Sequence, residues 1–215
     1  MDAAPPPVPE KPPAQDWSLL PLDLLSAVFI RLGLVEVLRG AGIVCRSWLD
    51  AAKVPDLWRV VDMENHIISF EDLDVWRARA KAAVDRSDGQ LRVFAGRRFV
   101  NAELMQYIVE RSPLLTTLRL VSCSSGVFSY RLASLMRESP LRELRSLILE
   151  NVDITVKKLT SILKRCPALE ALTVRDCSGM YVEDEETLRA KFARIKTLTF
   201  ECEDDDGSCC CGCDF

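Results

Sequence analysis

The second half of the chain repeats one short hydrophobic pattern. The clear copies are Leu115-x-x-Leu118-x-Leu120, Leu144-x-x-Leu147-x-Leu149, Leu169-x-x-Leu172-x-Val174 and Ile195-x-x-Leu198-x-Phe200. A weaker copy precedes them at Leu91-x-Val93. Counted from Leu91, the central leucines of the later copies follow at successive intervals of 27, 29, 25 and 26 residues. Intervals of about 20–29 residues are typical of solenoids in which each repeat contributes one strand.

Helix-forming segments separate these strands. We predict helices over 103–111, 130–138, 156–165 and 185–193. The first three are followed by Ser112-Pro113, Ser139-Pro140 and Cys166-Pro167, where proline ends the helix before the next strand. Strands alternating with helices predict an α/β region with a parallel sheet. In a right-handed solenoid of this kind the strands form the concave side and the helices the convex side.

The first part of the chain has a helical period instead. Apolar residues recur at helical spacing at Leu24, Leu25, Val28, Phe29 and Leu32, and glycine 33 is placed to cap that helix. A second short helix is expected over 34–38 and a third over 44–52. Three helices in about 40 residues bury little surface on their own. The surplus of apolar faces favours a partner, although such helices could also form the core of an ordinary helical domain.

A further helix is expected over 71–87, after an extended segment at 59–63. Its apolar stripe contains Leu73, Trp76, Ala80, Ala83 and Val84. Residues 77–98 also hold seven basic residues against two acidic ones, Asp85 and Asp88. The basic residues are Arg77, Arg79, Lys81, Arg86, Arg92, Arg97 and Arg98. This local excess indicates either a solvated helix face or a site for phosphate or an acidic partner.

The composition excludes several classes of protein. The 215 residues are 48% hydrophobic and 28% charged, which is typical of a globular chain, and the net charge of −4 argues against a general nucleic-acid binder. No apolar run approaches the ~20 residues of a membrane span, and the N-terminus does not resemble a signal peptide. We therefore expect a cytoplasmic or nuclear protein without membrane contact, with its nine cysteines reduced.

The two ends of the chain differ from the rest. Residues 1–16 hold six of the eleven prolines and are expected to form a disordered tail, with a ligand for SH3- or WW-type domains as the alternative. Residues 204–215 are expected to form an acidic, cysteine-rich tail. The Cys-Cys-Cys-Gly-Cys run at 209–213 is too crowded for a tetrahedral zinc site, so we expect no metal and no cofactor. Metal binding and palmitoylation of the tail remain alternatives.

The helical segment resembles the F-box, which docks a protein onto the Skp adaptor of Skp–cullin–F-box (SCF) ubiquitin ligases. The resemblance rests on Leu20-Pro21, on the acidic-Leu-Leu at 23–25, on the Val-Cys-Arg-Ser-Trp run at 44–48 and on the closing Leu57-Trp58. The sequence departs from the family at Gly40 and Gly42, where larger helix formers are usual. The implied adaptor-binding residues and their supporting core are Leu20, Pro21, Leu24, Leu25, Val28, Ile30, Leu32, Leu38, Val44, Cys45 and Trp48.

The repeats resemble the cysteine-containing leucine-rich repeats that often follow an F-box. Cys123 and Cys177 stand at the small buried position of that pattern, and Val152 takes it in the middle repeat. The whole chain is thus similar to plant F-box/leucine-rich-repeat proteins of the Skp-interacting type, with a short array. The expected organisation is an F-box over 17–62, a linker strand and helix capping the repeats over 63–87, and leucine-rich repeats over 88–203.

The repeat pattern also predicts a target-binding surface. If the leucines face the core, the intervening residues face the concave side. Exposed Phe94, Val121 and Ile148, flanked by Arg92, Arg119 and Arg175, are the candidates for holding an acidic, partly apolar segment of a target. The alternative is that these residues are covered by the capping segments of the solenoid.

No catalytic constellation is evident in the sequence. The single histidine, His66, leaves no set for nucleophilic catalysis, and neither a phosphate-binding glycine loop nor a paired-cysteine zinc module is present. The resemblance therefore implies a non-catalytic substrate-recognition subunit that binds the Skp adaptor, and through it a cullin–RING ligase, and an unknown protein target. The alternatives are a non-catalytic scaffold, a truncated competitor for the adaptor, and a small-ligand co-receptor.

Overall fold

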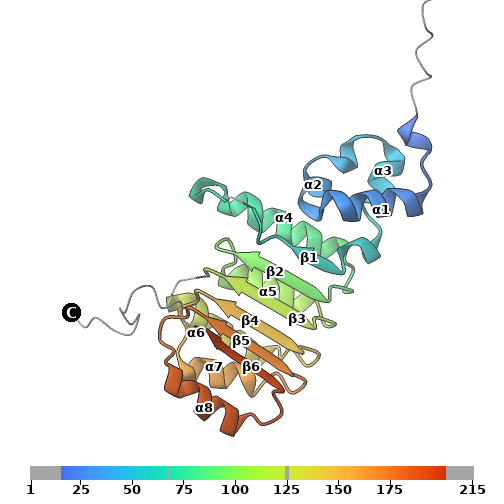
Figure 1. Ribbon diagram of the computed structural model, residues 1–215. Coiled ribbons are helices and arrows are strands. Elements are labelled where there is room, and N and C mark those ends of the chain that lie inside the picture. The colour runs from blue at the N-terminus through green and yellow to red at the C-terminus, as the bar shows by residue number, and fades with distance from the viewer. Residues whose placement is uncertain (1–15, 67, 124–125, 202–215) are drawn as a thin grey trace, which may run out of the picture.

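The computed structural model describes residues 16–66, 68–123 and 126–201 (Figure 1). The predicted tails, 1–16 and 204–215, lie outside these residues apart from Asp16. The N-terminal part is a small helical module, coloured blue in Figure 1. Its elements are η1 (Trp17–Leu19), α1 (Leu22–Leu32), α2 (Leu34–Arg39), η2 (Ala41–Ile43), α3 (Arg46–Ala51) and η3 (Pro55–Trp58). The three predicted helices are therefore present within the described residues.

A six-stranded parallel sheet follows the helical module, and its strand order is the sequence order. The strands are β1 (Val60–Asp62), β2 (Val93–Arg97), β3 (Thr117–Val121), β4 (Ser146–Glu150), β5 (Ala171–Arg175) and β6 (Thr197–Glu201). The connecting helices are η4 (Phe70–Asp72), α4 (Leu73–Arg86), α5 (Ala102–Arg111), α6 (Gly126–Glu138), α7 (Val156–Leu163) and α8 (Val182–Lys191). Figure 1 shows the strands on one side and the helices on the other, as an α/β solenoid requires.

The repeated leucines form the core between the sheet and the helices. Leu118, Leu147, Leu172 and Leu198 are paired in register across neighbouring strands, and each is at least 94% buried. The predicted small buried positions, Cys123, Val152 and Cys177, are also buried. One continuous cluster of buried apolar residues runs from the helical module into the last repeat. The helical module and the repeats therefore share a single hydrophobic core.

Two of the buried cysteines have thiols that resist ionisation. Burial raises the pKa of the Cys123 thiol to about 12 and that of the Cys166 thiol to about 11. Both thiols are protonated at neutral pH, and the cysteines that the structure describes are all free. These side chains therefore act as small apolar core residues rather than as nucleophiles.

The first copy of the repeat lies three residues later than the sequence analysis places it. In the observed register Phe94 pairs with Leu118, and Gly96 pairs with Leu120. Phe94 is fully buried, so the prediction that it is exposed on the concave side is wrong. Arg92 is exposed but precedes β2, so its predicted place in the concave row is also wrong. Ala95 and Arg97 occupy the two positions assigned to Arg92 and Phe94.

The close packing of Gly96 explains the misplaced register. A Cβ atom at this position would lie 2.9 Å from Cε1 of Phe94 and 2.5 Å from Cγ2 of Val100. The large ring of Phe94 thus fills the space that a second leucine occupies in the other copies. Because the copy reads Leu-x-x-Phe-x-Gly, its pattern is not evident from leucine spacing.

Each of the strands β2 to β5 is followed by one residue in the left-handed conformation. These residues and their φ angles are Arg98 (34°), Ser122 (52°), Asn151 (49°) and Asp176 (46°). Their N–H groups donate to the carbonyl oxygens of Val121, Glu150, Arg175 and Glu201 at 3.0, 2.8, 2.9 and 3.0 Å. The interstrand hydrogen bonds therefore continue one residue beyond each strand, and they hold the carboxyl ends of the strands in alignment.

Local signals account for the shape of the helical module. Pro21 is the N-terminal cap residue of α1, and its carbonyl oxygen accepts the N–H of Leu25 at 3.0 Å. Gly33 ends α1 with a φ of 86°, and its N–H donates to the Phe29 carbonyl oxygen at 3.1 Å. The helix α2 stops at Arg39, next to Gly40.

In the part of the chain that the structure describes, no helix is both long and apolar enough to cross a membrane.

Candidate functional site

The helical module exposes an unusual number of large apolar side chains. Ile43 is 87% exposed, Leu19 is 78% exposed and Ile30 is 69% exposed. We call the full set the N-terminal apolar surface: Trp17, Leu19, Leu22, Leu24, Ile30, Leu32, Ile43 and Val44. These residues come from η1, α1 and η2 with its cap, and all three segments pack on α3. Such concentrated apolar exposure is typical of protein-interaction surfaces.

The predicted adaptor-binding residues divide into surface and core. Pro21, Leu24, Ile30, Leu32 and Val44 are exposed. Leu25 is fully buried and cannot contact a partner, so it belongs to the supporting core. The remaining predicted residues are partly buried: Leu20, Val28, Leu38, Cys45 and Trp48. The resemblance alone could not separate these two roles.

Trp48 ties three parts of the module together. Its indole Nε1–H donates to the carbonyl oxygen of Trp17 at 3.1 Å, and its ring meets the buried Phe29 ring edge-on at 5.4 Å. The neighbouring Ser47 hydroxyl donates to the Ser18 carbonyl oxygen at 2.9 Å and lies 3.1 Å from the Cys45 sulfur. The Ser47 hydroxyl and the backbone N–H of Trp48 lower the pKa of the Cys45 thiol. These contacts fasten η1 to α3, so the leucine of η1 is held on the surface.

Sequence reasoning missed several of the most exposed residues. Ile43, Leu19, Leu22 and Trp17 were absent from the predicted set. Ile43 and Leu19 lie in single turns of 3-10 helix, where the α-helical period that reveals amphipathic faces does not apply. The sequence did hold one indication for Ile43, because a bulky apolar residue directly after the Gly40–Gly42 segment is not readily covered by a regular helix.

The second candidate surface is the open face of the sheet, which we call the sheet face. It carries the alternate strand residues that point away from the leucine core. Of the predicted target-binding residues, Arg119, Ile148 and Arg175 are partly exposed on this face. Val121 points the same way but is only 6% exposed, so it offers little apolar surface. The predicted combination of exposed apolar and basic residues is therefore only partly present.

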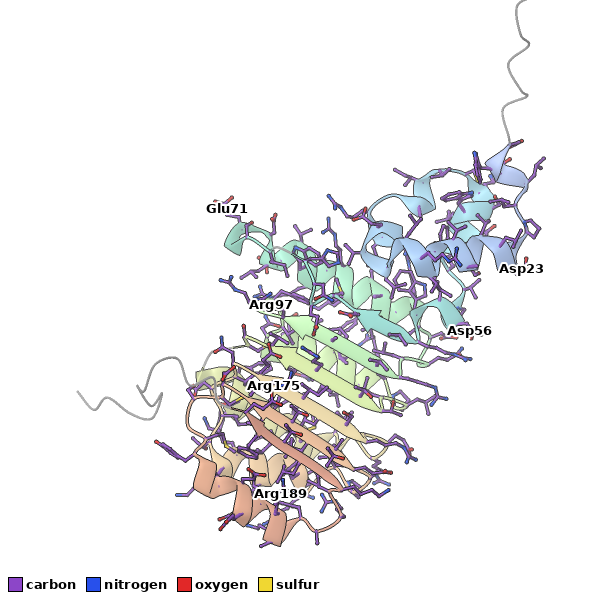
Figure 2. The ribbon with its side chains drawn as sticks, viewed as in Figure 1. Asp23, Asp56, Glu71, Arg97, Arg175 and Arg189 are labelled. Carbon is purple, nitrogen blue, oxygen red and sulfur yellow. The ribbon has the colours of Figure 1, made fainter. Side chains whose placement is uncertain are left out.

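The arginines at the middle of the sheet face are held in ion pairs. Nε of Arg119 lies 2.6 Å from Oε2 of Glu64, and its Nη2 lies 3.2 Å from Oε2 of Glu150. Nε of Arg175 lies 2.6 Å from Oε2 of Glu201. Figure 2 shows Arg175 at the carboxyl end of its strand. These pairs neutralise the positive charge that the sequence analysis assigned to target binding.

Glu64 connects the segment after β1 to the sheet face. Its side chain is 16% exposed, and burial raises the pKa of its carboxyl group, while the neighbouring Arg119 partly offsets that effect. The ion pair therefore places a poorly solvated carboxylate against the sheet. This contact fixes the linker to the repeats.

The described residues hold no cluster of three or more histidine, cysteine or acidic side chains that could bind a metal ion. The cysteine-rich run at 209–213, the only metal candidate considered from the sequence, lies outside them. His66 packs on Trp76 with a ring separation of 5.1 Å.

Comparison with known proteins identifies two parts of the chain. Residues 17–64 match the F-box-like family, and residues 126–199 match the family described as FBD-associated F-box protein At5g56370, LRR repeats. The putative F-box/LRR-repeat protein 9 of Arabidopsis thaliana is 33% identical over 174 residues, covering 77% of this chain and 67% of that protein. The chain belongs to the plant-type F-box/LRR-repeat family.

Other relatives are consistent with membership of the F-box/LRR-repeat family. The F-box protein SKIP19 of Arabidopsis thaliana is 39% identical over 123 residues, which cover 57% of this chain and 40% of that protein. The chain spans about half the length of the curated relatives it matches. The fold also overlaps the crystal structure of the yeast Rad7 and Elc1 complex with a TM-score of 0.46 and 16% identity, over 86% of this chain and 48% of that chain. That likeness is too distant to bear on function.

Proposed function

We propose that this F-box/LRR-repeat protein is a substrate-recognition subunit of an SCF-type ubiquitin ligase. In this proposal the N-terminal apolar surface docks onto a Skp-type adaptor, and through it onto a cullin–RING ligase. The sheet face of the repeats receives a target protein. The observation that carries the proposal is the exposure of the apolar residues of the F-box segment, led by Ile43 and Leu19.

The energetics of the N-terminal apolar surface favour docking. Apolar surface removed from water contributes about 25 cal/mol per Å², so several large side chains on one small module provide a substantial driving force. The core beneath the exposed residues of α1 is well packed, because Leu25 and Phe29 are fully buried there. A preformed surface loses little conformational freedom on binding, which favours affinity.

The contribution to ubiquitin transfer would be positional. A subunit that binds a target at one end and the adaptor at the other raises the effective concentration of target lysines near a conjugating enzyme. This role requires no reacting group on the subunit itself, so we propose that the protein is not itself an enzyme. The free thiols of the described cysteines are consistent with a reducing compartment, and we propose the cytoplasm or nucleus.

The test is a titration of the full chain with a Skp-type adaptor by isothermal calorimetry. Ile43→Asp places a charge in the proposed interface and should weaken binding at least about 30-fold, which is typical of a residue at the centre of an interface. Val75→Asp makes the same change at an exposed valine of α4 and should leave affinity within about twofold. Equal effects of the two substitutions, or no binding by a folded wild-type chain, would contradict the adaptor assignment.

The sheet-face assignment needs a separate test because adaptor binding alone also fits a competitor that recruits no target. A reconstituted ligase containing the full chain should ubiquitinate a protein that the sheet face of that chain captures. Capture that depends on the sheet face should fall with Ile148→Asp and persist with Thr187→Asp, a change at an exposed position of α8. Ubiquitination that is absent despite both interactions would favour the competitor or scaffold alternative.

A further inference from the structure

A groove of about 700 Å³, which we call the α5–α6 groove, runs between two helices of the repeats. Figure 1 shows α5 and α6 on the side of the sheet opposite its open face. Phe128 and Leu135 form the floor and are 3% and 9% exposed, while Asn101 and Gln106 contribute the wall on α5. Tyr130 lines the same groove and is 65% exposed, more than any other large apolar side chain that the structure describes in the repeats. An exposed aromatic ring beside an open groove is a feature of protein interfaces.

The α5–α6 groove lies beside the longest repeat of the array. The central leucines Leu118 and Leu147 are 29 residues apart, whereas the next two intervals are 25 and 26 residues. This repeat also holds the longest helix, because α6 has 13 residues while α5 has 10 and α7 has 8. Neighbours that are shorter than α6 cannot cover its side along the whole length, so part of that side remains open.

Two opposite charges of α6 line the groove without an ion-pair partner in the chain. Arg131 and Glu138 are both exposed, and neither forms an ion pair with a residue that the structure describes. Glu103, on the α5 side, is instead paired with Lys81 at 2.6 Å. Glu138 is also the last residue of α6, where the helix dipole disfavours a carboxylate. Contacts within the chain therefore do not account for this charge.

Arg131 and Glu138 match each other under a two-fold rotation. They are separated by two turns, which is about 10 Å along the axis, so they lie on one face of α6. When a second α6 lies antiparallel on the first, each Arg131 meets the Glu138 of the other copy. The two-fold axis then passes between positions 134 and 135, where the small Ser134 lines the groove and permits close approach. Such a self-complementary patch is what a symmetric dimer requires.

We propose that two copies of the chain form a two-fold symmetric dimer through their α5–α6 grooves, with the two α6 helices packed antiparallel. The contact holds an Arg131–Glu138 ion pair at each end and covers both Tyr130 rings. Tyrosine and arginine are among the residue types that most often dominate the binding energy of interfaces. A helix suits this groove because both walls are helices, whose backbone groups are hydrogen-bonded internally and offer no edge to an extended strand.

The dimer leaves the other two surfaces of the chain uncovered. The N-terminal apolar surface belongs to the helical module, and the sheet face lies on the side of the solenoid opposite α6 (Figure 1). A dimer therefore carries two copies of each surface, and it binds a partner with two matching segments more tightly than a monomer does without any new contact. The inference goes beyond the proposed function and does not depend on it, because the groove residues take no part in adaptor docking.

Sedimentation equilibrium of the full chain tests the dimer. The wild-type chain should show a concentration-dependent mass between 24.2 kDa and twice that mass. Arg131→Glu and Glu138→Arg should each weaken self-association at least about 30-fold, because each replaces two attractive contacts with two repulsive ones. An equimolar mixture of these two variants should associate within about threefold of wild type, because the facing charges are again opposite. A wild-type chain that stays monomeric would leave the groove to another protein and overturn the proposal, as would a mixture that does not associate.

Two control variants separate this contact from other modes of association. Lys157→Glu makes the same charge reversal at an exposed position of α7, and Ile43→Asp alters the N-terminal apolar surface. Both should leave self-association within about twofold of wild type. Weakening by Lys157→Glu equal to that by Arg131→Glu, or loss of the dimer with Ile43→Asp, would overturn the proposal. Failure of the wild-type chain to bind a Skp-type adaptor would remove the proposed function and leave the dimer assignment intact.

Discussion

The helical module and the repeats use the same apolar residue types for opposite purposes. Eight large apolar side chains between residues 17 and 44 are at least 49% exposed. Among the residues from 91 to 201 whose side-chain exposure the structure describes, only Leu114, Tyr130 and Tyr181 are large, apolar and exposed. The repeated leucines are buried against their neighbours, whereas several leucines and isoleucines of the module are about half exposed or more in the described structure.

The difference follows from the size of the elements. Each repeat stacks on the next, so a leucine in one strand meets a leucine in the adjacent strand, as Leu118 meets Leu147. The helices α2 and α3 have only six residues each and can cover little of α1. A small module whose apolar residues exceed what it can bury leaves them exposed, and the proposed docking onto an adaptor rests on this exposure.

The largest expected effect is on stability and distinguishes core from surface. Phe94→Ala should lower the free energy of unfolding by about 3–5 kcal/mol, because it empties a fully buried ring site at the start of the sheet. Ile43→Ala should change stability by less than about 0.5 kcal/mol, because that side chain is already in water. Urea denaturation followed by circular dichroism measures both. Similar losses for the two variants would show that the exposed isoleucine contributes to the folded core.

A smaller effect tests the close packing in β2. Gly96→Ala should cost about 1–3 kcal/mol, because the added Cβ would overlap Cγ2 of Val100 and Cε1 of Phe94. Val100→Ala in the same chain should recover part of that loss by removing one of the overlapping groups. A double-mutant cycle in urea measures the recovery. Additive losses would mean that the strand shifts instead of overpacking.

The Glu64 carboxyl group should make stability depend on pH. Burial raises its pKa above the usual 4.5, so the folded state holds this proton more tightly than the unfolded state does. Stability contributed by this residue is then complete below about pH 4.5 and declines as the pH rises through the folded pKa. The wild-type chain should accordingly lose stability relative to Glu64→Gln over that interval. A stability difference that is constant from pH 4 to pH 7 would contradict the burial of this carboxylate.

The smallest expected effect concerns the left-handed residues after the strands. Ser122→Gly should stabilise the fold by about 0.5 kcal/mol, because glycine adopts a φ of 52° without steric cost. Asn151→Gly should give less, because asparagine tolerates this conformation better than most residues. Thermal unfolding of the two variants compares them directly. Destabilisation by Ser122→Gly would indicate that the serine side chain matters more than the backbone.

Most of the fold was predictable because the hydrophobic residues that form its core recur at regular spacing along the sequence. The leucine spacing gave the strands from Leu118 onward, and the proline signals ended the helices before Leu115, Leu144 and Leu169 within a few residues. The position of the first repeat was predicted wrongly because a large Phe94 and a side-chain-free Gly96 take the places of the two leucines of the other copies. A search for leucine spacing cannot detect this substitution of one large and one small residue. The register of β2 against β3 follows from the packing of Phe94 against Gly96 and Val100.

The candidate surfaces were less predictable than the fold. The F-box resemblance identified the correct segment, but it grouped the buried Leu25 with the exposed Leu24 and omitted Ile43. On the sheet face, sequence spacing placed Arg119 and Arg175 outward, yet it could not show that acidic neighbours neutralise them. Ion pairing across strands depends on register and rotamer, which a single sequence does not display.

If the proposed function is right, the N-terminal apolar surface is covered when the chain binds a Skp-type adaptor. Hydroxyl-radical footprinting of the full chain, free and saturated with a Skp-type adaptor, tests it side chain by side chain. We expect strong protection of Leu19, Leu24 and Ile43, with Tyr130 and Tyr181 labelled equally in both states. Unchanged labelling of the three apolar residues in a saturated complex, or protection confined to the tyrosines of the repeats, would contradict it.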